Sequence, residues 1–260
     1  MKVTILGSGT STGVPVIGCP CRVCTSGNPK NRRLRVSAYL DTGTRKILID
    51  CSPDFRRQAL DNGLKRVDAV LFTHDHADHC HGIDDLRMMN YLQGYQPIPC
   101  WAPTPSAERL LGRFGYAFGM SSYPGAPKLK LTPIEPGRFD CLDLPEVEAI
   151  PVPHGPAGTT FAYRIGPFAY VTDCNDVPAA ARERLRNLDV LVLDALRWDP
   201  HPTHMSISSS LAVVEDLAPR LCIFTHMTHD VDHDELQGKM PGNVLVGYDG
   251  LSSEVRVPAA

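Results

Sequence analysis

The stretch HDHADH, residues 74–79, decides how this 260-residue chain is interpreted. It places three imidazoles and at least one free carboxylate within six residues. It follows Val67–Thr73, a nearly continuous apolar run that predicts a strand covered on both faces. Imidazole and carboxylate suit zinc, manganese or iron, and a turn at a strand end can direct them to two neighbouring positions. A solvated polar turn is the alternative, but histidine is too uncommon for that alternative to be favoured.

Several predicted strands run into an ionisable residue. The residues that close or follow these strands are Asp50, His74, Asp173, Asp194 and His226. Because rigid strands that deliver polar groups to one edge build a preorganised site, we expect these side chains to converge. Strand ends also attract polar residues because they are wet, which would account for some of these positions but not for the histidine-rich stretch.

Apolar runs bounded by turn residues alternate with helical periodicity along the chain. The predicted strands are Lys2–Gly7, Val36–Asp41, Lys46–Cys51, Val67–Thr73, Phe168–Thr172, Val190–Leu193 and Leu221–Thr225. The predicted helices are Asp54–Leu64, Ala107–Phe118, Ala179–Leu188 and Ile207–Leu217, with Ser206 as N-cap of the last. No linker divides the chain, so we expect residues 1–260 to form one layered α/β domain. The stretch Leu92–Leu131, rich in proline and glycine, is expected to be an irregular excursion over the core.

Composition and charge disfavour several classes of partner. The chain is 43% hydrophobic and 21% charged, with a formal net charge of −3. This balance gives no global electrostatic case for binding nucleic acid or an anionic membrane. No apolar run approaches the roughly 20 residues of a membrane span, and the first residues lack the pattern of a signal peptide. We therefore expect a soluble, cytoplasmic protein whose substrate is a small molecule, with a homodimer left open.

Three of the nine cysteines lie in one loop, residues 18–24. Cys19, Cys21 and Cys24 follow a C-x-C-x2-C pattern, and thiolate spacing this close is typical of structural zinc sites with four ligands. His229, three residues beyond His226, is the natural fourth ligand. Reduced surface thiols are the alternative. The remaining cysteines mostly lie in apolar runs and are expected to be buried: Cys51, Cys80, Cys100, Cys141, Cys174 and Cys222.

The pattern His-x-His-x-Asp-His at residues 74–79 resembles the signature of the metallo-β-lactamase superfamily. The resemblance covers essentially the whole chain, because His154, Asp173 and His226 follow in the family order, each after a predicted strand. It implies a four-layered αββα sandwich with a dinuclear metal site along one edge. It also implies the ligand sets: His74, His76 and His154 for one metal, Asp78, His79 and His226 for the other, and Asp173 as the bridge.

Such a pair of metals has a definite chemical use. Two divalent ions roughly 3.5–4 Å apart can share a hydroxide, generate a nucleophile at neutral pH and stabilise an in-line displacement. The mixed ligand set accepts either Zn²⁺ or Mn²⁺. We expect Asp50 and Asp194 to orient imidazoles through their free N–H groups, with a purely structural role as an equal alternative for each.

The cysteine loop narrows the resemblance to the superfamily branch that contains the phosphoribosyl cyclic phosphate phosphodiesterase of phosphonate breakdown. The resemblance to this branch extends to the segments 225–229 and 247–250. It implies a structural zinc held by the loop cysteines and His229. It further implies that His204 is the general acid, a role suited to an imidazole that titrates near neutrality. Asp78, as metal ligand, and His204 are thus the residues expected to take part directly in catalysis.

The resemblance favours a phosphodiesterase that cleaves a small or cyclic phosphodiester through a metal-bridging hydroxide, with two catalytic metals and one structural zinc. A lactonase and a transfer-RNA-processing ribonuclease of the same fold are alternatives, and so is a non-catalytic accessory protein like that of pyrroloquinoline quinone biosynthesis. The near-neutral charge and the lack of a long basic insertion disfavour the ribonuclease. An accessory protein would be favoured by the loss of a catalytic ligand, and the sequence retains all of them.

Several charged residues stay outside this scheme. Arg32, Arg33 and Arg35 are expected to form a solvated loop, with contact to a phosphate as the alternative. His81 and His233 are expected to be surface histidines.

Overall fold

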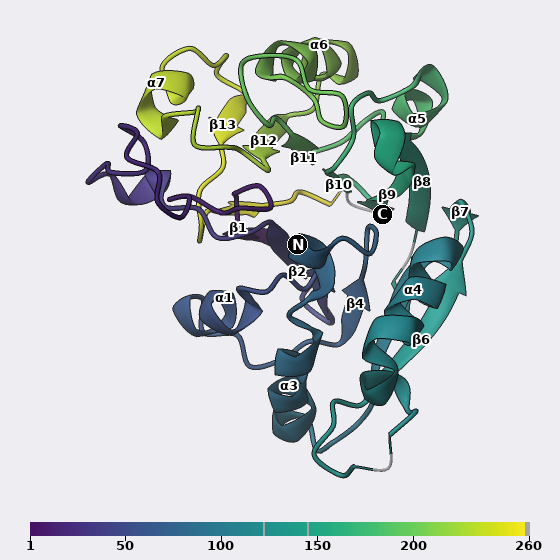
Figure 1. The fold of residues 1–260 in the computed structure, drawn as a ribbon. Helices are drawn as coiled ribbons and strands as arrows, with labels where there is room; N and C mark the ends of the chain where they lie inside the picture. Colours follow the sequence, from purple (N-terminus) through teal and green to yellow (C-terminus); the bar gives the residue numbers. More distant parts are fainter. Residues whose placement is uncertain (122, 145, 258–260) are drawn as a thin grey trace.

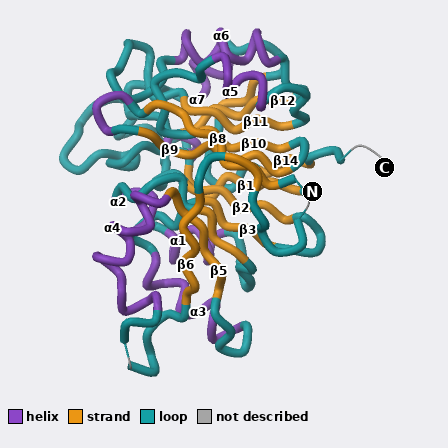
Figure 2. The backbone as a smooth tube through the Cα atoms, turned by 90° about the vertical axis from the view of Figure 1, so that its right-hand side faces the viewer, coloured by secondary structure: helices purple, strands orange, loops and turns teal. Residues whose placement is uncertain are grey.

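The computed structural model describes residues 1–121, 123–144 and 146–257. Two seven-stranded sheets lie face to face, with helices on their outer sides (Figure 1). Turned by 90°, the strands form the middle of the molecule, with helices outside them (Figure 2). The αββα sandwich implied by the sequence resemblance is confirmed. Among the described residues, no helix has both the length and the apolar character needed to cross a membrane.

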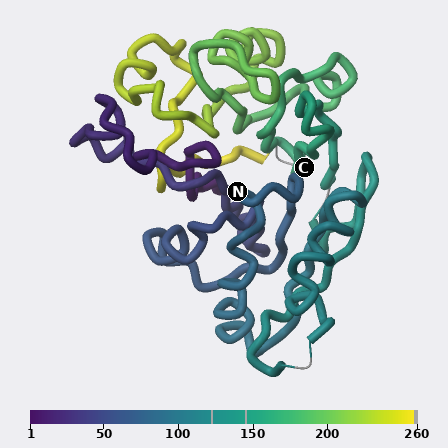
Figure 3. The backbone as a smooth tube through the Cα atoms, in the orientation of Figure 1, coloured from purple at the N-terminus to yellow at the C-terminus, as the bar shows by residue number. Residues whose placement is uncertain are grey.

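The first sheet has the order β14-β1-β2-β3-β4-β5-β6. Its strands are β1 (Lys2–Gly7), β2 (Ser37–Asp41), β3 (Lys46–Ile49), β4 (Ala69–Leu71), β5 (Ile98–Pro103), β6 (Leu129–Ile134) and β14 (Ser252–Glu254). Strands β3 to β6 are parallel, whereas β14, β1 and β2 pair antiparallel with their neighbours. The yellow C-terminal segment in Figure 3 returns to the purple N-terminal strand, where β14 pairs with β1.

The second sheet has the order β13-β12-β11-β10-β9-β8-β7. Its strands are β7 (Gly137–Arg138), β8 (Val147–Pro153), β9 (Thr159–Ile165), β10 (Phe168–Val171), β11 (Val190–Asp194), β12 (Leu221–Thr225) and β13 (Val244–Val246). Strands β10 to β13 are parallel, so their carboxyl ends meet at one edge of the sheet.

Helices cover the outer face of each sheet (Figure 1). They are α1 (Phe55–Asp61), α2 (Ala77–Cys80), α3 (Leu86–Leu92), α4 (Thr104–Phe114), α5 (Ala179–Arg184), α6 (Ile207–Leu217) and α7 (His233–Gln237). Helix α6 begins at the predicted N-cap, because the Ser206 hydroxyl accepts a hydrogen bond from the Ser209 amide at 3.2 Å. Three apolar clusters fill the spaces between the four layers, the central one drawing on both sheets.

The stretch Leu92–Leu131 corrects one expectation, because it is not an irregular excursion. It contains β5, helix α4 and the start of β6, and both strands belong to the first sheet. The prolines in this stretch made the two strands hard to predict, because proline removes a donor from the hydrogen-bond ladder and usually indicates the end of a strand. Pro133 lies in β6, which is the edge strand where a missing donor is tolerated.

Two hydrogen bonds fasten the sheets together next to residue 74. The hydroxyl of Tyr163, on β9, donates to the carbonyl of Phe72 at 2.8 Å. The Phe161 amide, on the same strand, donates to the carbonyl of Thr73 at 3.0 Å. The second sheet therefore fixes the backbone that leads into the histidine-rich stretch.

The Tyr163→Phe variant tests this inter-sheet contact. It leaves the buried carbonyl of Phe72 without that donor, so we expect the free energy of unfolding to fall by about 1–3 kcal/mol. Urea denaturation followed by circular dichroism measures the change. Tyr116→Phe, which removes a hydroxyl at an exposed position, should stay within about 0.5 kcal/mol of the parent protein. Equal losses in both variants would contradict the role given to Tyr163.

Candidate metal centres

The ionisable residues at the strand ends converge on one edge of the sandwich. His74 follows β4, His154 follows β8, and His226 follows β12. Asp173 lies two residues after β10. His76 and the short helix α2 complete the histidine-rich stretch, with Asp78 and His79 on the helix. The convergence expected from the strand ends is therefore what the backbone produces.

Three of the strand-end residues adopt the left-handed backbone conformation. The φ angles are 60° at Asp50, 55° at Asp173 and 63° at His226. Non-glycine residues adopt this region uncommonly, and such strain concentrates at functional sites. The sharp turn directs each side chain across the sheet edge instead of along the strand. Sequence periodicity gives no signal for this conformation.

Three groups of potential ligands contain Asp173, one of them with Asp194, His204 and His226 and the other two as follows. His74, His76, His154 and Asp173 each offer one ligand atom, and these atoms lie within 4.8 Å of one another. Asp78, His79, Asp173 and His226 form a second group with the same property. These are the two ligand sets implied by the sequence resemblance. Together the seven residues are called the His/Asp cluster below.

The two oxygens of Asp173 face different imidazoles. Oδ2 lies 3.1 Å from His79 Nε2 and 3.4 Å from His226 Nε2. Oδ1 lies 4.0 Å from His74 Nε2 and 3.8 Å from His154 Nε2. A carboxylate held in this way can bind two cations at once, one through each oxygen.

Two of the imidazoles are fixed through Nδ1, which leaves Nε2 for a ligand role. His79 Nδ1 donates to Asp50 Oδ2 at 2.7 Å, and His154 Nδ1 donates to the Thr203 carbonyl at 2.8 Å. Nε2 of His74, His79 and His226 is buried and has no hydrogen-bond partner within the described part of the chain. Unpaired buried nitrogens that converge on carboxylates fit a divalent cation, which would satisfy them.

The surroundings shift the pKa values of the imidazole and the carboxylate ligands for different reasons. Burial and the facing imidazole of His79 hold the pKa of His74 well below its usual range, so this imidazole is neutral. Burial alone would raise the pKa of Asp173. The imidazoles of His226 and His79 outweigh burial and hold that pKa well below the usual range. Burial alone would lower the pKa of His226, but the facing carboxylate of Asp173 raises it to about 9. A metal would therefore displace a proton from His226, since neutral imidazole and ionised carboxylate are the forms that bind metals.

His204 stands at the edge of the His/Asp cluster. Its Nε2 lies 3.9 Å from Asp173 Oδ1, and its Nδ1 donates to Asp194 Oδ2 at 2.9 Å. Its ring stacks on that of His226, with centroids 4.6 Å apart and 16° between the planes. Asp194 therefore orients His204, as Asp50 orients His79.

One functional position in the histidine-rich stretch has no signal in the sequence pattern. Asp75 occupies a position that the His-x-His-x-Asp-His pattern treats as a spacer, yet its side chain is buried. It pairs with Arg109 and Arg113, both on α4, which lies in the stretch expected to be irregular. Arg109 and Arg113 do lie within the predicted helix Ala107–Phe118, but no local pattern links that helix to Asp75.

The cysteine loop and His229 form a separate group of four ligand atoms within 4.8 Å of one another. The Sγ atoms of Cys19, Cys21 and Cys24 lie 3.2, 3.5 and 3.5 Å from His229 Nδ1. A hydrogen bond from the Cys24 amide contributes most to lowering the pKa of Cys21 to about 6, which favours its thiolate. Three thiols and an imidazole in this arrangement fit a closed structural zinc site. The other six cysteines are buried, as expected.

Two expectations near this loop are wrong. Arg33 is 1% exposed, and its Nη1 donates to the Thr228 carbonyl at 3.0 Å. His233 is 2% exposed, and its amide donates to Asn31 Oδ1 at 2.8 Å. Both were expected at the surface because charge and imidazole usually favour water. Here Arg33 is buried against the backbone of Thr228, and His233, at the start of α7, is buried against Asn31 and the carbonyl of Val246. The chain around the cysteine loop lies near α7 in Figure 1. His81 is exposed, and Arg32 is also exposed, as expected.

The Asp50→Asn variant tests how the His/Asp cluster is oriented. It weakens the acceptor of the His79 N–H, so we expect affinity for Zn²⁺ at this cluster to fall about 10- to 100-fold. Competition with a coloured chelator measures the affinity. Asp41→Asn, at a strand end that faces Lys46, is the matched control and should leave the affinity unchanged. An unchanged affinity in Asp50→Asn would contradict the orienting role.

The Cys21→Ser variant tests the cysteine site. Because a closed site with three remaining ligands holds zinc poorly, we expect one metal equivalent per chain to be lost. Elemental analysis of the purified protein counts the metals. Cys222→Ala removes a buried thiol of the core and should keep every equivalent. If Cys21→Ser and Cys222→Ala bind the same amount of metal, the loop is not a metal site.

Comparison with known proteins places this geometry in a family. A model described as the beta-lactamase superfamily domain matches residues 45–227. A solved structure described as a new diphosphatase from the PhnP family is 38% identical, covers 98% of each chain and gives a TM-score of 0.89. Zn²⁺-bound PqqB from Methylobacterium extorquens is 20% identical over 98% of this chain and 100% of its own, with a TM-score of 0.78, and shares the fold.

A curated relative is named for a different activity from that of the diphosphatase. An octanoyltransferase of Porphyromonas gingivalis is 37% identical over 257 residues, which are 97% of this chain and 51% of that protein. The present chain therefore spans about half the length of that relative. The family model covers most of the chain, and the match to the diphosphatase extends nearly from end to end. The chain belongs to the metallo-β-lactamase superfamily and resembles its PhnP family.

Proposed function

We propose that this protein is a dinuclear metal-dependent phosphodiesterase that hydrolyses a small or cyclic phosphodiester. The observation that carries the proposal is the position of Asp173, whose two oxygens face two sets of imidazoles. Membership of the superfamily supports a metal-dependent hydrolase. Similarity to a diphosphatase of the PhnP family supports phosphorus, rather than a carboxyl carbon, as the reacting centre.

The His/Asp cluster would hold both metals. His74, His76 and His154 would bind one, Asp78, His79 and His226 the other, and Asp173 would bridge them. When bound, two divalent ions such as Zn²⁺ or Mn²⁺ supply Lewis-acid activation of water and neutralise charge on phosphate oxygens. Asp50 and the carbonyl of Thr203 hold the imidazoles of His79 and His154 in their orientations throughout the reaction. The cysteine loop with His229 would hold a structural zinc outside the reaction.

His204 would supply the proton that the leaving oxygen needs. In the imidazolium form, Nδ1–H bonds to Asp194, and Nε2–H is directed toward the space beside Asp173. The carboxylate of Asp194 holds the imidazole ring in this orientation. Transfer of the Nε2 proton to the departing alkoxide avoids expulsion of a strong base. His204 is then neutral and must recover a proton before the next cycle.

The alternatives have less support. An accessory protein needs only part of a metal site, whereas here all seven residues of the His/Asp cluster converge. A ribonuclease needs a basic surface for RNA, and the net charge of this chain is −3. A lactonase would use the same metals, so a panel of phosphodiesters and lactones, each with Zn²⁺ and Mn²⁺, separates it from the proposed phosphodiesterase.

The His204→Ala variant tests both the activity and the acid. With bis(p-nitrophenyl) phosphate the leaving group is weakly basic and needs little protonation, so we expect only a small loss of kcat. With diesters of more basic alcohols, we expect kcat to fall roughly 10²–10⁴-fold. The slope of log kcat against leaving-group pKa measures this difference.

His201→Ala is the matched control, because His201 lies in the same loop with its ring centroid 5.3 Å from that of His204. We expect its slope to equal that of the parent protein. An unchanged slope in His204→Ala would remove the acid role but leave the phosphodiesterase in place. Full metal loading with no turnover of any phosphodiester would refute the proposed function itself.

A further inference from the structure

One carboxylate outside the His/Asp cluster joins parts of the chain that are far apart in sequence. Asp249 lies between β13 and β14. Its Oδ1 accepts hydrogen bonds from the amide and the hydroxyl of Ser8, both at 2.9 Å, and its Oδ2 accepts from the Leu34 amide at 2.7 Å. Ser8 and Leu34 are 241 and 215 positions away from it. The proposed reaction gives no role to this side chain.

The segment fastened by Asp249 holds the residue next to His226. The Met227 amide donates to the Ser8 carbonyl at 3.0 Å, and the Thr10 amide donates to the Met227 carbonyl at 3.2 Å. A continuous series of hydrogen bonds therefore leads from the Asp249 carboxylate through Ser8 to the backbone of Met227. Ser8 and Met227 are fully buried, so water does not compete for these bonds.

A second contact supports the same turn. Arg33 is buried, and its Nη1 donates to the Thr228 carbonyl at 3.0 Å. Burial lowers the pKa of Arg33 to about 10, and the negative charges of Asp249 and Asp232 oppose this shift. Asp249 thus acts on the turn after His226 in two ways, through hydrogen bonds to Ser8 and through its charge near Arg33.

His226 depends on its backbone for orientation. The imidazoles of His79 and His154 are each fixed by a hydrogen bond from Nδ1. In the described part of the chain, neither ring nitrogen of His226 has a hydrogen-bond partner, although both are buried. Stacking on His204 sets the plane of the ring but leaves rotation within that plane free. The position of Nε2 is therefore set by the turn itself, whose φ angle at His226 is 63°.

We propose that Asp249 is a positioning residue that fixes the backbone of His226 and thereby the metal position to which His226 contributes. The proposal rests on the metal-binding part of the proposed function. Below, the first metal position is that of His74, His76 and His154, and the second is that of Asp78, His79 and His226. Asp249 acts on the second position, because its hydrogen bonds lead to Met227.

The Asp249→Asn variant tests the proposal. An amide has nearly the size of the carboxylate, but its NH₂ group must face the donors of either Ser8 or Leu34, so one set of hydrogen bonds is lost. We expect the affinity of the second position for Zn²⁺ to fall about tenfold and that of the first to stay unchanged. Zinc first fills the cysteine loop, and competition with a coloured chelator then measures both affinities.

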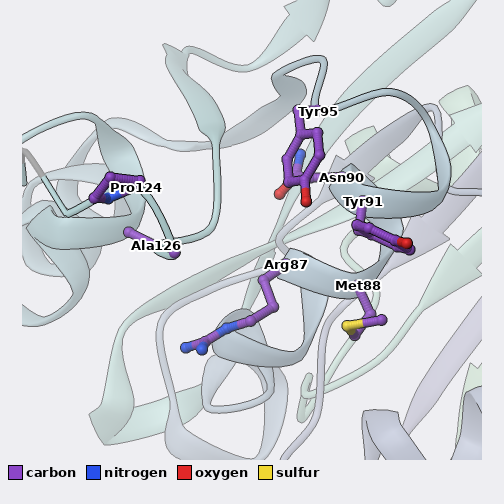
Figure 4. Close-up of a pocket in the computed structure, with 8 residues that line it drawn as sticks. Arg87, Met88, Asn90, Tyr91, Tyr95, Pro124 and Ala126 are labelled. Atoms are coloured by element: carbon purple, nitrogen blue, oxygen red, sulfur yellow. The ribbon is translucent and has the colours of Figure 1, made fainter.

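Asn90→Asp is the matched control, because Asn90 on α3 also joins distant segments through three hydrogen bonds. Its Nδ2 donates to the carbonyls of Gln96 and Lys128 at 2.8 and 2.9 Å, and its Oδ1 accepts from the Lys128 amide at 2.9 Å. Figure 4 shows Asn90 at a cavity of about 330 Å³ that is lined by none of the His/Asp cluster. Both variants should lower the free energy of unfolding, measured with urea, but Asn90→Asp should keep both Zn²⁺ affinities.

A double-mutant comparison locates the effect. His154→Ala weakens the first position and leaves the second intact, whereas His226→Ala does the reverse. Adding Asp249→Asn to His154→Ala should lower the Zn²⁺ affinity of the remaining position about tenfold. Adding it to His226→Ala should cause no further loss, because the residue that Asp249 positions is already absent.

The outcomes separate this inference from the proposed function. If the parent protein binds no metal at the His/Asp cluster, the proposed function fails and the role of Asp249 fails with it. If the parent protein binds two metals there and Asp249→Asn affects affinity no more than Asn90→Asp does, only the role of Asp249 is refuted. Equal losses in the His154→Ala and His226→Ala proteins would refute it as well. If Asp249→Asn fails to fold, Ser8→Ala, which removes one donor to Oδ1, should give a smaller loss confined to the second position.

Discussion

The approach of one carboxylate, that of Asp173, to several buried imidazoles is the constraint on which the site depends. Burying these groups without compensation is unfavourable, because an unpaired buried imidazole or carboxylate loses its solvation. The fold accepts this arrangement at the ends of β8, β10 and β12, where the backbone turns sharply. The local strain at Asp173 and His226 is tolerated because strands paired on both sides of β10 and β12 hold the turns in register. A rigid scaffold that concentrates charge is suited to binding divalent cations.

The sequence was informative wherever a strand led directly into a polar residue. Strands β1 and β12 and helix α6 have the predicted bounds, and the strand ends bring His154, Asp173 and His226 to the histidine-rich stretch. These successes share a cause. An apolar run followed by an ionisable side chain is a local signal, and parallel strands convert several such signals into one edge.

The sequence was misleading where function depends on partners far along the chain. Asp75 acquires its role from arginines more than thirty positions away, and no local pattern connects them. Arg33 is buried against Thr228, and His233 is buried against Asn31, so their surroundings arise only from tertiary packing. The prolines of β5 and β6 disguised two strands, whereas the helix between them was predicted, with α4 beginning at Thr104 instead of Ala107.

One short segment connects the cysteine site to the His/Asp cluster. His226 and His229 are separated by two residues, and the carbonyl of Thr228 between them accepts from the buried Arg33. The Gly9 backbone forms bridges both to Arg35 and to Met227. The loop therefore braces the turn that presents His226, and thiol chemistry and hydrolytic chemistry share one stretch of backbone.

The pairing of β14 with β1 has a consequence for how the chain is made. Strand β1 keeps one side without its neighbour until β14, far along the chain, has also been synthesised. An open strand side offers unsatisfied amides and carbonyls to other chains, which invites intermolecular association. Molecules that lack Ser252–Glu254 are thus the vulnerable species, and this segment of three residues covers the open side of β1 once it has been made.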